Sequence, residues 1–402
     1  MKTIDAFEPW HSEFTAIRRA IHAWPELAYE EVRTADTVAR LLTDWGIEIH
    51  RGLGVTGVVG TIHGREPGAA LGLRADMDAL PMSEANTFEH ASRNPGAMHA
   101  CGHDGHTTML LAAARYLAEH RDFAGAIHVI FQPAEEGQGG ARQMIEDGLF
   151  EQCPMQAVFG MHNWPGIPAG SFGLTAGPIM ASSSTFEIII NGRGAHGAMP
   201  HLGIDPVMAA VQLAQSYQTI LSRELDPLDP AVISVTQIHT GSADNVIPDQ
   251  ATLRGTVRTF SSEALDLIET RMREMTEHLG HAQRCTTTFS FDRRYPATVN
   301  HAAESELCAA VMRDLVGAEH VNDLVRPSMG AEDFSFMLQA RPGCYVWIGN
   351  GEGDHRSAGH GAGPCSLHNS SYDFNDALIP LGAAYWVELA YRWLAEKHRQ
   401  PS

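Results

Sequence analysis

The feature that most constrains the fold is a change in the order of strands and helices near residue 182. Before that point, short apolar runs of strand length alternate with stretches of helical periodicity. ALGLRA at residues 70–75 is followed by a helical stretch at 107–120 and then by GAIHVIF at 125–131. Such alternation is typical of an α/β domain built on a largely parallel sheet. We therefore expect this part of the chain to form an α/β domain.

The middle of the chain follows a different order. It reads as strand, helix, strand, strand, helix, strand, which is the order of a ferredoxin-like unit. Residues suited to helix N-caps precede both helices: Asp205 before Pro206, and Ser261 or Ser262. The sequence predicts an inserted ferredoxin-like domain at residues 182–294, within an α/β domain made of residues 1–181 and 295–402. Two domains suit a chain of 402 residues, because single cores rarely grow beyond roughly 250 to 300 residues.

Composition and charge exclude several classes of protein. The net charge of −20 argues against a nucleic-acid partner, which would need clustered Lys and Arg. No run approaches the ~20 apolar residues of a membrane span, and the N-terminal stretch MKTIDAFEPWHSEF lacks the apolar core of an export signal. We expect a cytoplasmic protein that handles small molecules, with its six cysteines reduced.

One glycine-rich motif has the spacing of a nucleotide-binding fingerprint without its context. GLGVTG at residues 52–57 matches G-x-G-x-x-G, but that spacing binds phosphate where it follows a strand and opens a helix. Here it follows a predicted helix and leads into a strand-like run. We interpret these glycines as turn residues.

The residues that carry chemistry are of the types that bind metals. HACGHDGHT places Cys101 and His103 just before an apolar helix, where the pair fits a metal site and an ordinary polar loop equally well. Further ligand types follow downstream: VIFQPAEEG contains Glu135 and Glu136, VFGMHNWP contains His162, and CSLHN contains His368. Adjacent residues that leave a strand point in different directions. One carboxylate of the Glu pair can therefore bind metal while the other faces a reacting water.

Five such ligands are too many for a tetrahedral structural zinc and suit two metal ions with positions open for water. The set is Cys101, His103, Glu136, His162 and His368. Thiolate, imidazole and carboxylate together fit Zn, Mn, Co or Ni, and they do not fit Ca. RADMDALP adds two carboxylates at the end of a predicted strand, Asp76 and Asp78. We expect Asp78 to orient a ligand imidazole, the alternative being a solvated turn residue.

Taken together, these motifs resemble the aminoacylase, hippurate hydrolase and indoleacetyl-amino-acid amidohydrolase family, a branch of the dinuclear-metal exopeptidases related to carboxypeptidase G. The matching stretches run from about Arg18 to His368 and are RRAIHAWPELAYEE, RADMDALP, HACGHDGHT, FQPAEEG, GMHNWP, GRGAHGAMPH, NVIPD, GTVRTF, GAEDFSFM and LHN. The resemblance implies a metal-binding α/β domain with an inserted ferredoxin-like lid. It also implies a homodimer, or a dimer of dimers, formed through that lid.

The resemblance assigns roles to the residues of the metal cluster. Glu135 is the implied general base, and Glu136 is an implied metal ligand. Cys101 is the implied bridge between two divalent ions, and His103, His162 and His368 complete the two metal sites.

Three lid residues have roles only through the resemblance. It implies that His196, in GRGAHGAMPH, reaches into the active site of the neighbouring subunit. It also implies that Asn245 and Arg258 lie near the carboxylate of the substrate. Judged by residue type alone, His196 would be a loop histidine and Arg258 an exposed strand residue in a surface ion pair.

The expected reaction is hydrolysis of the amide bond of an N-acyl amino acid, such as an N-acetyl or N-benzoyl one, to a carboxylic acid and a free amino acid. A water bridging the two metals would attack, with Glu135 as general base. Two alternatives remain open at this point. The first is a dipeptidase or carboxypeptidase with the same metals, and the second is a metal-binding relative that has lost catalysis. A zinc nucleobase deaminase is excluded because the sequence has no H-x-E motif that is followed by P-C-x-x-C.

Overall fold

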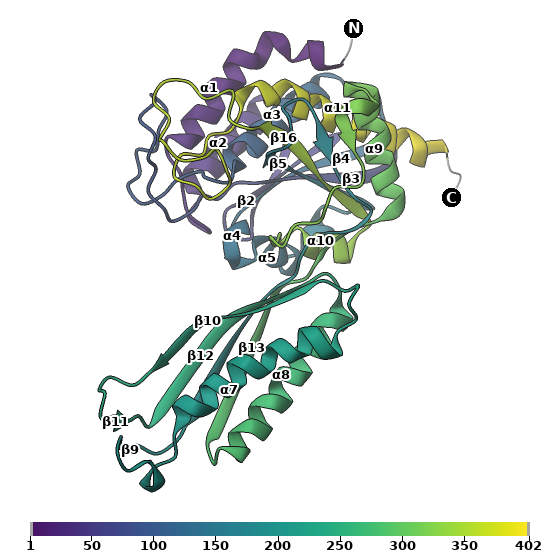
Figure 1. Cartoon of the computed structure of the whole chain (residues 1–402). Helices are drawn as coiled ribbons and strands as arrows, with labels where there is room; N and C mark the ends of the chain where they lie inside the picture. The colour runs from purple at the N-terminus through teal and green to yellow at the C-terminus, as the bar shows by residue number, and fades with distance from the viewer. Residues whose placement is uncertain (1–2, 400–402) are drawn as a thin grey trace. The chain divides into compact units, whose positions relative to one another are not determined.

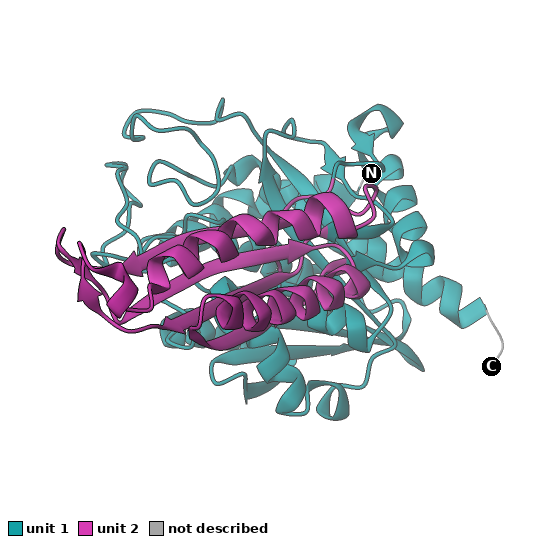
Figure 2. Cartoon of the chain, turned by 60° about the horizontal axis from the view of Figure 1, so that its bottom comes forward, with its two compact units in different colours: residues 1–179, 299–326, 333–402 teal, residues 180–298, 327–332 magenta. Residues whose placement is uncertain are grey.

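The computed structural model describes residues 3–399 and divides the chain into two compact units. The first unit comprises residues 1–179, 299–326 and 333–402, and the second comprises residues 180–298 and 327–332 (Figure 2). The predicted boundaries lie at 181/182 and 294/295. The chain passes between the two units at 179/180 and at 298/299, close to these positions. The second unit also includes the short segment 327–332, which no sequence pattern marked.

The first unit is built on an eight-stranded sheet (Figure 1). In order across the sheet, the strands are β1 (Glu48–Leu53), β2 (Gly57–His63), β4 (Ala124–Gln132), β3 (Glu66–Asp76), β5 (Ala157–Pro165), β16 (Gly343–Gly351), β6 (Phe172–Gly173) and β15 (Val321–Asn322). The four central strands β4, β3, β5 and β16 are parallel to one another, and β1, β2 and β6 pair antiparallel. The carboxyl ends of the central strands therefore lie on one edge of the sheet.

Helices of the first unit are α1 (His11–His22), α2 (Val32–Asp44), α3 (His103–Glu119), α4 (Glu135–Gln138), α5 (Gly140–Glu146), α6 (Leu149–Gln152), α9 (Ala302–Val316), α10 (Ser335–Ala340) and α11 (Ile379–Arg399). The sequence predicted α3 at residues 107–120, but the helix begins at His103. Its first turn is polar and buried, so apolar periodicity could not mark it.

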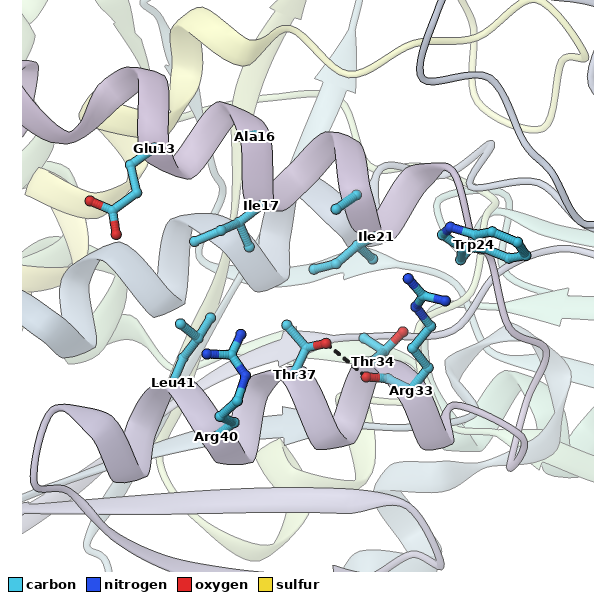
Figure 3. Close-up of a pocket in the computed structure, with 11 residues that line it drawn as sticks. Glu13, Ala16, Ile17, Ile21, Trp24, Arg33, Thr34, Thr37, Arg40 and Leu41 are labelled. Atoms are coloured by element: carbon cyan, nitrogen blue, oxygen red, sulfur yellow. Dashed lines mark hydrogen bonds between the residues drawn. The ribbon is translucent and has the colours of Figure 1, made fainter.

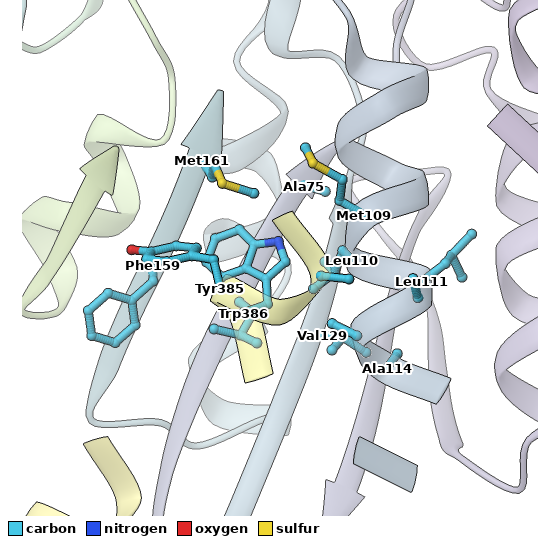
Figure 4. Packing of buried hydrophobic residues seen from close by; sticks show 14 of the residues in the cluster. Ala75, Met109, Leu110, Leu111, Ala114, Val129, Phe159, Met161, Tyr385 and Trp386 are labelled. Atoms are coloured by element: carbon cyan, nitrogen blue, oxygen red, sulfur yellow. The ribbon is translucent and has the colours of Figure 1, made fainter. Parts of the chain in front are cut away.

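The core of this unit lies where α3 and α11 pack against the parallel strands (Figure 4). Met109 and Leu110 of α3 and Trp386 of α11 are completely or almost completely buried. Gly105, in the first turn of α3, permits a close approach, because a Cβ there would lie 2.3 Å from the ring of Phe374. This packing fixes the end of α3 that carries His103.

The second unit has the predicted ferredoxin-like order. Its elements are β8 (Ser183–Asn191), α7 (Pro206–Thr219), β10 (Ala231–Thr240), β12 (Gln250–Thr259), α8 (Ser262–Ala282) and β13 (Thr286–Tyr295). The sheet is antiparallel in the order β10-β12-β8-β13. Both helices are capped as expected, because the Asp205 carboxylate accepts from Val207 N at 2.8 Å and the Ser261 hydroxyl accepts from Ala264 N at 3.2 Å.

The structure also contains short strands and short helices. A two-stranded ribbon of the second unit consists of β9 (Ala195–His196) and β11 (Val246–Ile247), and another pair consists of β7 (Gly177–Met180) and β14 (Thr298–Asn300). The remaining short helices are Thr3–Ala6, Glu8–Trp10, Pro200–Leu202, Ile220–Glu224, Ala318–His320 and Asp376–Leu378. Within residues 3–399, no helix combines the length and the apolar character needed to cross a membrane.

A surface groove of about 460 Å³ lies between α1 and α2 (Figure 3). Ile17, Ile21 and Trp24 on one side face Arg33 and Leu41 on the other. None of the residues that line it is among the predicted site residues.

A buried histidine in β4 predicts how the stability of the fold depends on pH. His128 Nδ1 lies 3.0 Å from the Thr61 hydroxyl and Nε2 lies 3.2 Å from Pro154 O, so both ring nitrogens have partners in the neutral form. Burial lowers the pKa of His128 from 6.5 to about 4. Because an unfolded chain would bind a proton here below pH 6.5 and the folded chain would not, this residue's contribution to stability is complete above pH 6.5. It is lost as the pH falls towards 4.

We predict that the unfolding free energy of the wild type, compared with that of His128→Gln, falls by about 2 kcal/mol between pH 7 and pH 5. Urea unfolding of both proteins at the two pH values measures this difference, and the variant corrects for all other titrating groups. A difference that stays constant over this pH range would contradict the prediction.

Candidate active site

The predicted metal-binding residues of the first unit come together at the carboxyl edge of the sheet. Glu135 and Glu136 follow β4, His162 lies near the end of β5, and Cys101 and His103 lie where a loop enters α3. These are neighbouring parts of one edge because β4, β3 and β5 are adjacent and parallel. His368, from the loop after β16, joins the same cluster.

Five groups of potential metal ligands in the described residues have their ligand atoms within 4.8 Å of one another, and three of these groups consist of predicted site residues alone. They are Cys101 with His103 and His162, Cys101 with Glu136 and His368, and His103 with Glu135 and Glu136. Cys101 Sγ lies 3.3 Å from His162 Nε2, and His368 Nε2 lies 3.2 Å from Glu136 Oε1. Cys101 thus belongs to both groups that contain the other four predicted ligands, as a bridging ligand would.

The loop that carries Cys101 has no room for a side chain beside it. Gly102 has a φ of 89°, and a Cβ at this position would lie 2.2 Å from Asn163 Nδ2 and 2.4 Å from the Tyr372 hydroxyl. Asn163 Nδ2 donates to Cys101 O at 2.6 Å, and the Tyr372 hydroxyl donates to Asn163 Oδ1 at 2.7 Å. Glycine is required here both by the backbone conformation and by the close approach.

Asp78 connects a histidine of the cluster to the loop of the paired glutamates. Its Oδ1 lies 3.1 Å from His103 Nδ1, and its Oδ2 accepts a hydrogen bond from Glu136 N at 2.9 Å. The carbonyl oxygen of Asp78 also lies 2.9 Å from His103 Nδ1. A proton on Nδ1 leaves Nε2 as the nitrogen that can bind a metal.

Asp76 takes part in a different interaction that sequence reasoning missed. Its carboxylate lies 2.6 Å from His106 Nδ1 and accepts from Arg74 at 2.8 Å. His106 Nε2 in turn accepts from Asn163 N at 2.8 Å. A charged Arg74 inside the apolar run ALGLRA was the one available sign of this buried network, because a buried arginine needs a carboxylate partner.

Two buried side chains of α1 also contact the first turn of α3. The Asp104 carboxylate lies 2.8 Å from His22 Nδ1 and 3.4 Å from Arg18 Nη1, and Arg18 also donates to Asp373 at 2.9 Å. Arg18, His22 and Asp104 are almost completely buried. The RRAIHAW stretch of the sequence therefore supports the helix end that carries His103.

Burial and neighbouring charges shift the pKa values of the cluster in different directions. Burial raises the pKa of the Cys101 thiol, so the free thiol is a poor nucleophile at neutral pH. Burial lowers the pKa of His162 well below its usual value, which leaves that imidazole neutral with a lone pair to donate. Burial opposes protonation of His103 too, yet the Asp76 carboxylate raises the pKa of this residue well above its usual value.

The residues present fit two divalent ions. His103 Nε2 is buried, and no residue in the described part of the chain hydrogen-bonds to it. Hydrogen bonds to Cys101 and Glu136 raise the pKa of His368 to about 10, so His368 carries a proton at neutral pH. That proton lies among the sulfur, nitrogen and oxygen atoms that these three side chains offer to a metal. Metal binding requires these ligands to be deprotonated and releases such protons.

The three predicted lid residues lie in the second unit. His196 in β9 and the adjacent Asn245 are exposed on the β9–β11 ribbon, where Gly197 N donates to Asn245 O at 2.7 Å. Arg258 lies in β12 and is half-buried, and burial lowers its pKa. The structure thus brings His196 and Asn245 together. Their roles towards the metal cluster of the first unit stay predictions.

Comparison with known proteins agrees with this geometry. A family description, Peptidase family M20/M25/M40, matches residues 72–392. The chain is 40% identical over 382 residues to the hippurate hydrolase of Campylobacter jejuni, with 95% of this chain and 97% of that protein covered. It is also 40% identical over 385 residues to thermostable carboxypeptidase 1 of Saccharolobus solfataricus, with 94% of each chain covered.

Among solved structures, a Bacillus subtilis protein described as a dinuclear metal binding peptidase from the M20 family has a TM-score of 0.83 to this chain. It shares 33% sequence identity, and the similarity covers 96% of this chain and 99% of the other. Both the fold and the metal-binding class therefore have a counterpart of known structure.

The shared contacts of Asp78 generate a prediction on metal binding. Asp78→Asn removes the charge that orients His103. It also leaves one side-chain oxygen, whereas both carboxylate oxygens of Asp78 make contacts. We therefore expect the affinity for Mn²⁺ to fall roughly 10- to 100-fold. Competition with a fluorescent chelator measures this affinity. Asp122→Asn, which changes an exposed carboxylate in a surface ion pair with Arg65, is the matched control. Equal affinity in Asp78→Asn and the control would show that Asp78 does not support the site.

Proposed function

The chain belongs to peptidase family M20/M25/M40 and is an enzyme that hydrolyses amide bonds, and from this membership we propose that it cleaves N-acyl amino acids to a carboxylic acid and a free amino acid. One observation carries the proposal: the adjacent carboxylates Glu135 and Glu136 lie in one cluster with Cys101 and three histidines. A site that only bound metal would have no use for a second carboxylate beside the ligand. The hippurate hydrolase likeness supports an acyl group on the substrate nitrogen.

The proposed ligands of two divalent ions are Cys101, His103, Glu136, His162 and His368. Their mixture of sulfur, nitrogen and oxygen suits Mn, Zn, Co or Ni. When bound, two such ions supply the Lewis acidity that makes water a nucleophile at neutral pH.

In this proposal Glu135 performs the proton transfers. Its carboxylate takes a proton from the attacking water as the water oxygen bonds to the acyl carbon. It then delivers that proton to the nitrogen as the carbon–nitrogen bond breaks. Glu135 is 7% exposed, and Asp333 N lies 3.4 Å from its Oε1, so the side chain is held inside the site.

Three residues of the second unit are proposed to contact the substrate. We assign His196 of the partner subunit to the developing oxyanion, a contact of a type commonly worth about 3 kcal/mol. Asn245 and Arg258 would bind the substrate carboxylate. This assignment requires the predicted homodimer, or dimer of dimers, formed through the second unit. We also propose a cytoplasmic location for the protein.

Replacement of the proposed base gives the first test of the function. Glu135→Gln keeps the shape of the side chain but removes its basicity, so we expect unchanged metal content and a kcat lowered by roughly 10²- to 10⁴-fold. Product release from N-benzoyl and N-acetyl amino acids measures kcat, and metal analysis by mass spectrometry measures loading. Glu146→Gln, an exposed glutamate in α5, is the control.

The same assay separates the proposal from its alternatives. It is run with Mn, Zn, Co and Ni loaded separately and with dipeptides beside the acyl substrates. Preference for dipeptides would replace the acylase with a dipeptidase or carboxypeptidase, an activity class that the similarity to thermostable carboxypeptidase 1 also supports. No hydrolysis under any metal loading would indicate a protein that binds metal without catalysis.

The shared-site assignment has its own test. His196→Ala and Glu135→Gln homodimers should both be nearly inactive. If His196 acts across subunits, a verified heterodimer of the two variants contains one site with both residues intact and should regain up to about half the activity of wild type, because separate subunits each supply one part. A heterodimer without recovered activity would mean that each chain completes its own site.

A further inference from the structure

The loop that carries Glu135 contains an unusual backbone conformation immediately before that residue. Ala134 has a φ of 55°, and Gly137 and Gly139 have φ values of 82° and 72°. The two glycines adopt this left-handed conformation easily, whereas an alanine adopts it only when the surrounding structure enforces it. Ala134 is fully buried, so its surroundings can be identified.

The group that holds Ala134 is the carboxylate of Glu31. Ala134 N donates to Glu31 Oε1 at 2.9 Å, and the other carboxylate oxygen accepts from the Thr56 hydroxyl at 2.6 Å. Ala134 O accepts from Gly140 N at 3.0 Å, which closes the loop from the other side. The position of the peptide plane that precedes Ala134 is thus determined by Glu31.

A glutamate at position 31 costs more free energy to bury than a neutral residue that makes the same structural contact. It lies directly before α2 with 0% of its surface exposed, and burial raises its pKa to about 7. A buried carboxylate carries a desolvation cost that a neutral acceptor would largely avoid. Neither the metal cluster nor the proton transfers described above use this side chain.

We infer that Glu31 is a positioning residue of the enzyme, which acts through the backbone of Ala134 to aim the Glu135 carboxylate at the reacting water. The inference rests on the proposed function, because it takes Glu135 as the base. Its physical basis is the direct chain connection: a rotation at Ala134 moves the Cα–Cβ bond of the next residue. Displacement of a catalytic group by about 1 Å can lower the rate roughly 100-fold.

Two substitutions separate positioning from charge. Glu31→Gln keeps a side-chain oxygen at the right distance to accept from Ala134 N, so we expect kcat within about threefold of wild type. Glu31→Ala removes the acceptor, so kcat should fall roughly 10- to 100-fold while KM and metal content stay close to wild-type values. Both variants are compared at temperatures well below their measured melting temperatures. Glu30→Ala, the exposed neighbour in the sequence, is the control.

A second measurement keeps the test valid whatever the substrate proves to be. Hydrogen exchange of the Ala134 amide, measured without substrate, should be faster in Glu31→Ala and unchanged in Glu31→Gln and Glu30→Ala. Should Glu31→Ala be too unstable to assay, Glu31→Asp retains the charge but is one methylene shorter, and it should show the same faster exchange and lower kcat.

The outcomes distinguish this inference from the function on which it rests. Normal kcat in a well-folded Glu31→Ala protein would overturn the inference, and so would equal losses in the Gln and Ala variants. Unchanged exchange of the Ala134 amide would also overturn it. A wild-type protein that hydrolyses none of the substrates would instead contradict the proposed function, and the exchange result would then decide the structural part alone.

Discussion

The site depends on how the buried backbone N–H groups of the loop after β4 are satisfied. This part of the chain includes α4, which has non-helical backbone angles at Glu136 and Gly137, and the first turn of α5, where N–H groups have no partner within the helix. Such N–H groups need other acceptors. Carboxylates from three distant segments supply them: Glu31 accepts from Ala134 N, Asp78 from Glu136 N and Asp333 from Ala141 N. The segment that presents both glutamates is therefore held by charged groups in addition to its own short helices.

The same carboxylates connect this segment to the proposed metal ligands. Asp78 contacts both His103 and the Glu136 backbone, so a change in either position is transmitted to the other. Asp333 also accepts from Arg74 and Gln132, at the ends of β3 and β4. The proposed metal ligands and the proposed base are thus held by one hydrogen-bond network, which suits proton transfer at a fixed distance.

The sequence predicted those features that depend on local pattern. Strands β3 and β4, the ferredoxin-like order and the capping residues Asp205 and Ser261 all follow from periodicity and turn chemistry. The five clustered candidate ligands could be named because parallel strands bring their carboxyl ends together. Features that depend on distant partners could not be predicted. Glu31 lies about a hundred positions from Ala134, and the role of His106 depends on Asp76 and Asn163. The start of α3 at His103 was missed because that turn is polar.

The central proposal is that five side chains hold two metal ions while Glu135 transfers protons and is not a metal ligand. Anomalous diffraction from crystals of the Mn²⁺-loaded protein tests it most directly. The account predicts two manganese peaks in each subunit, with Cys101 sulfur beside both and with His103, Glu136, His162 and His368 as the remaining protein ligands. A single peak, or a Glu135 oxygen bound directly to manganese in place of Glu136, would contradict it.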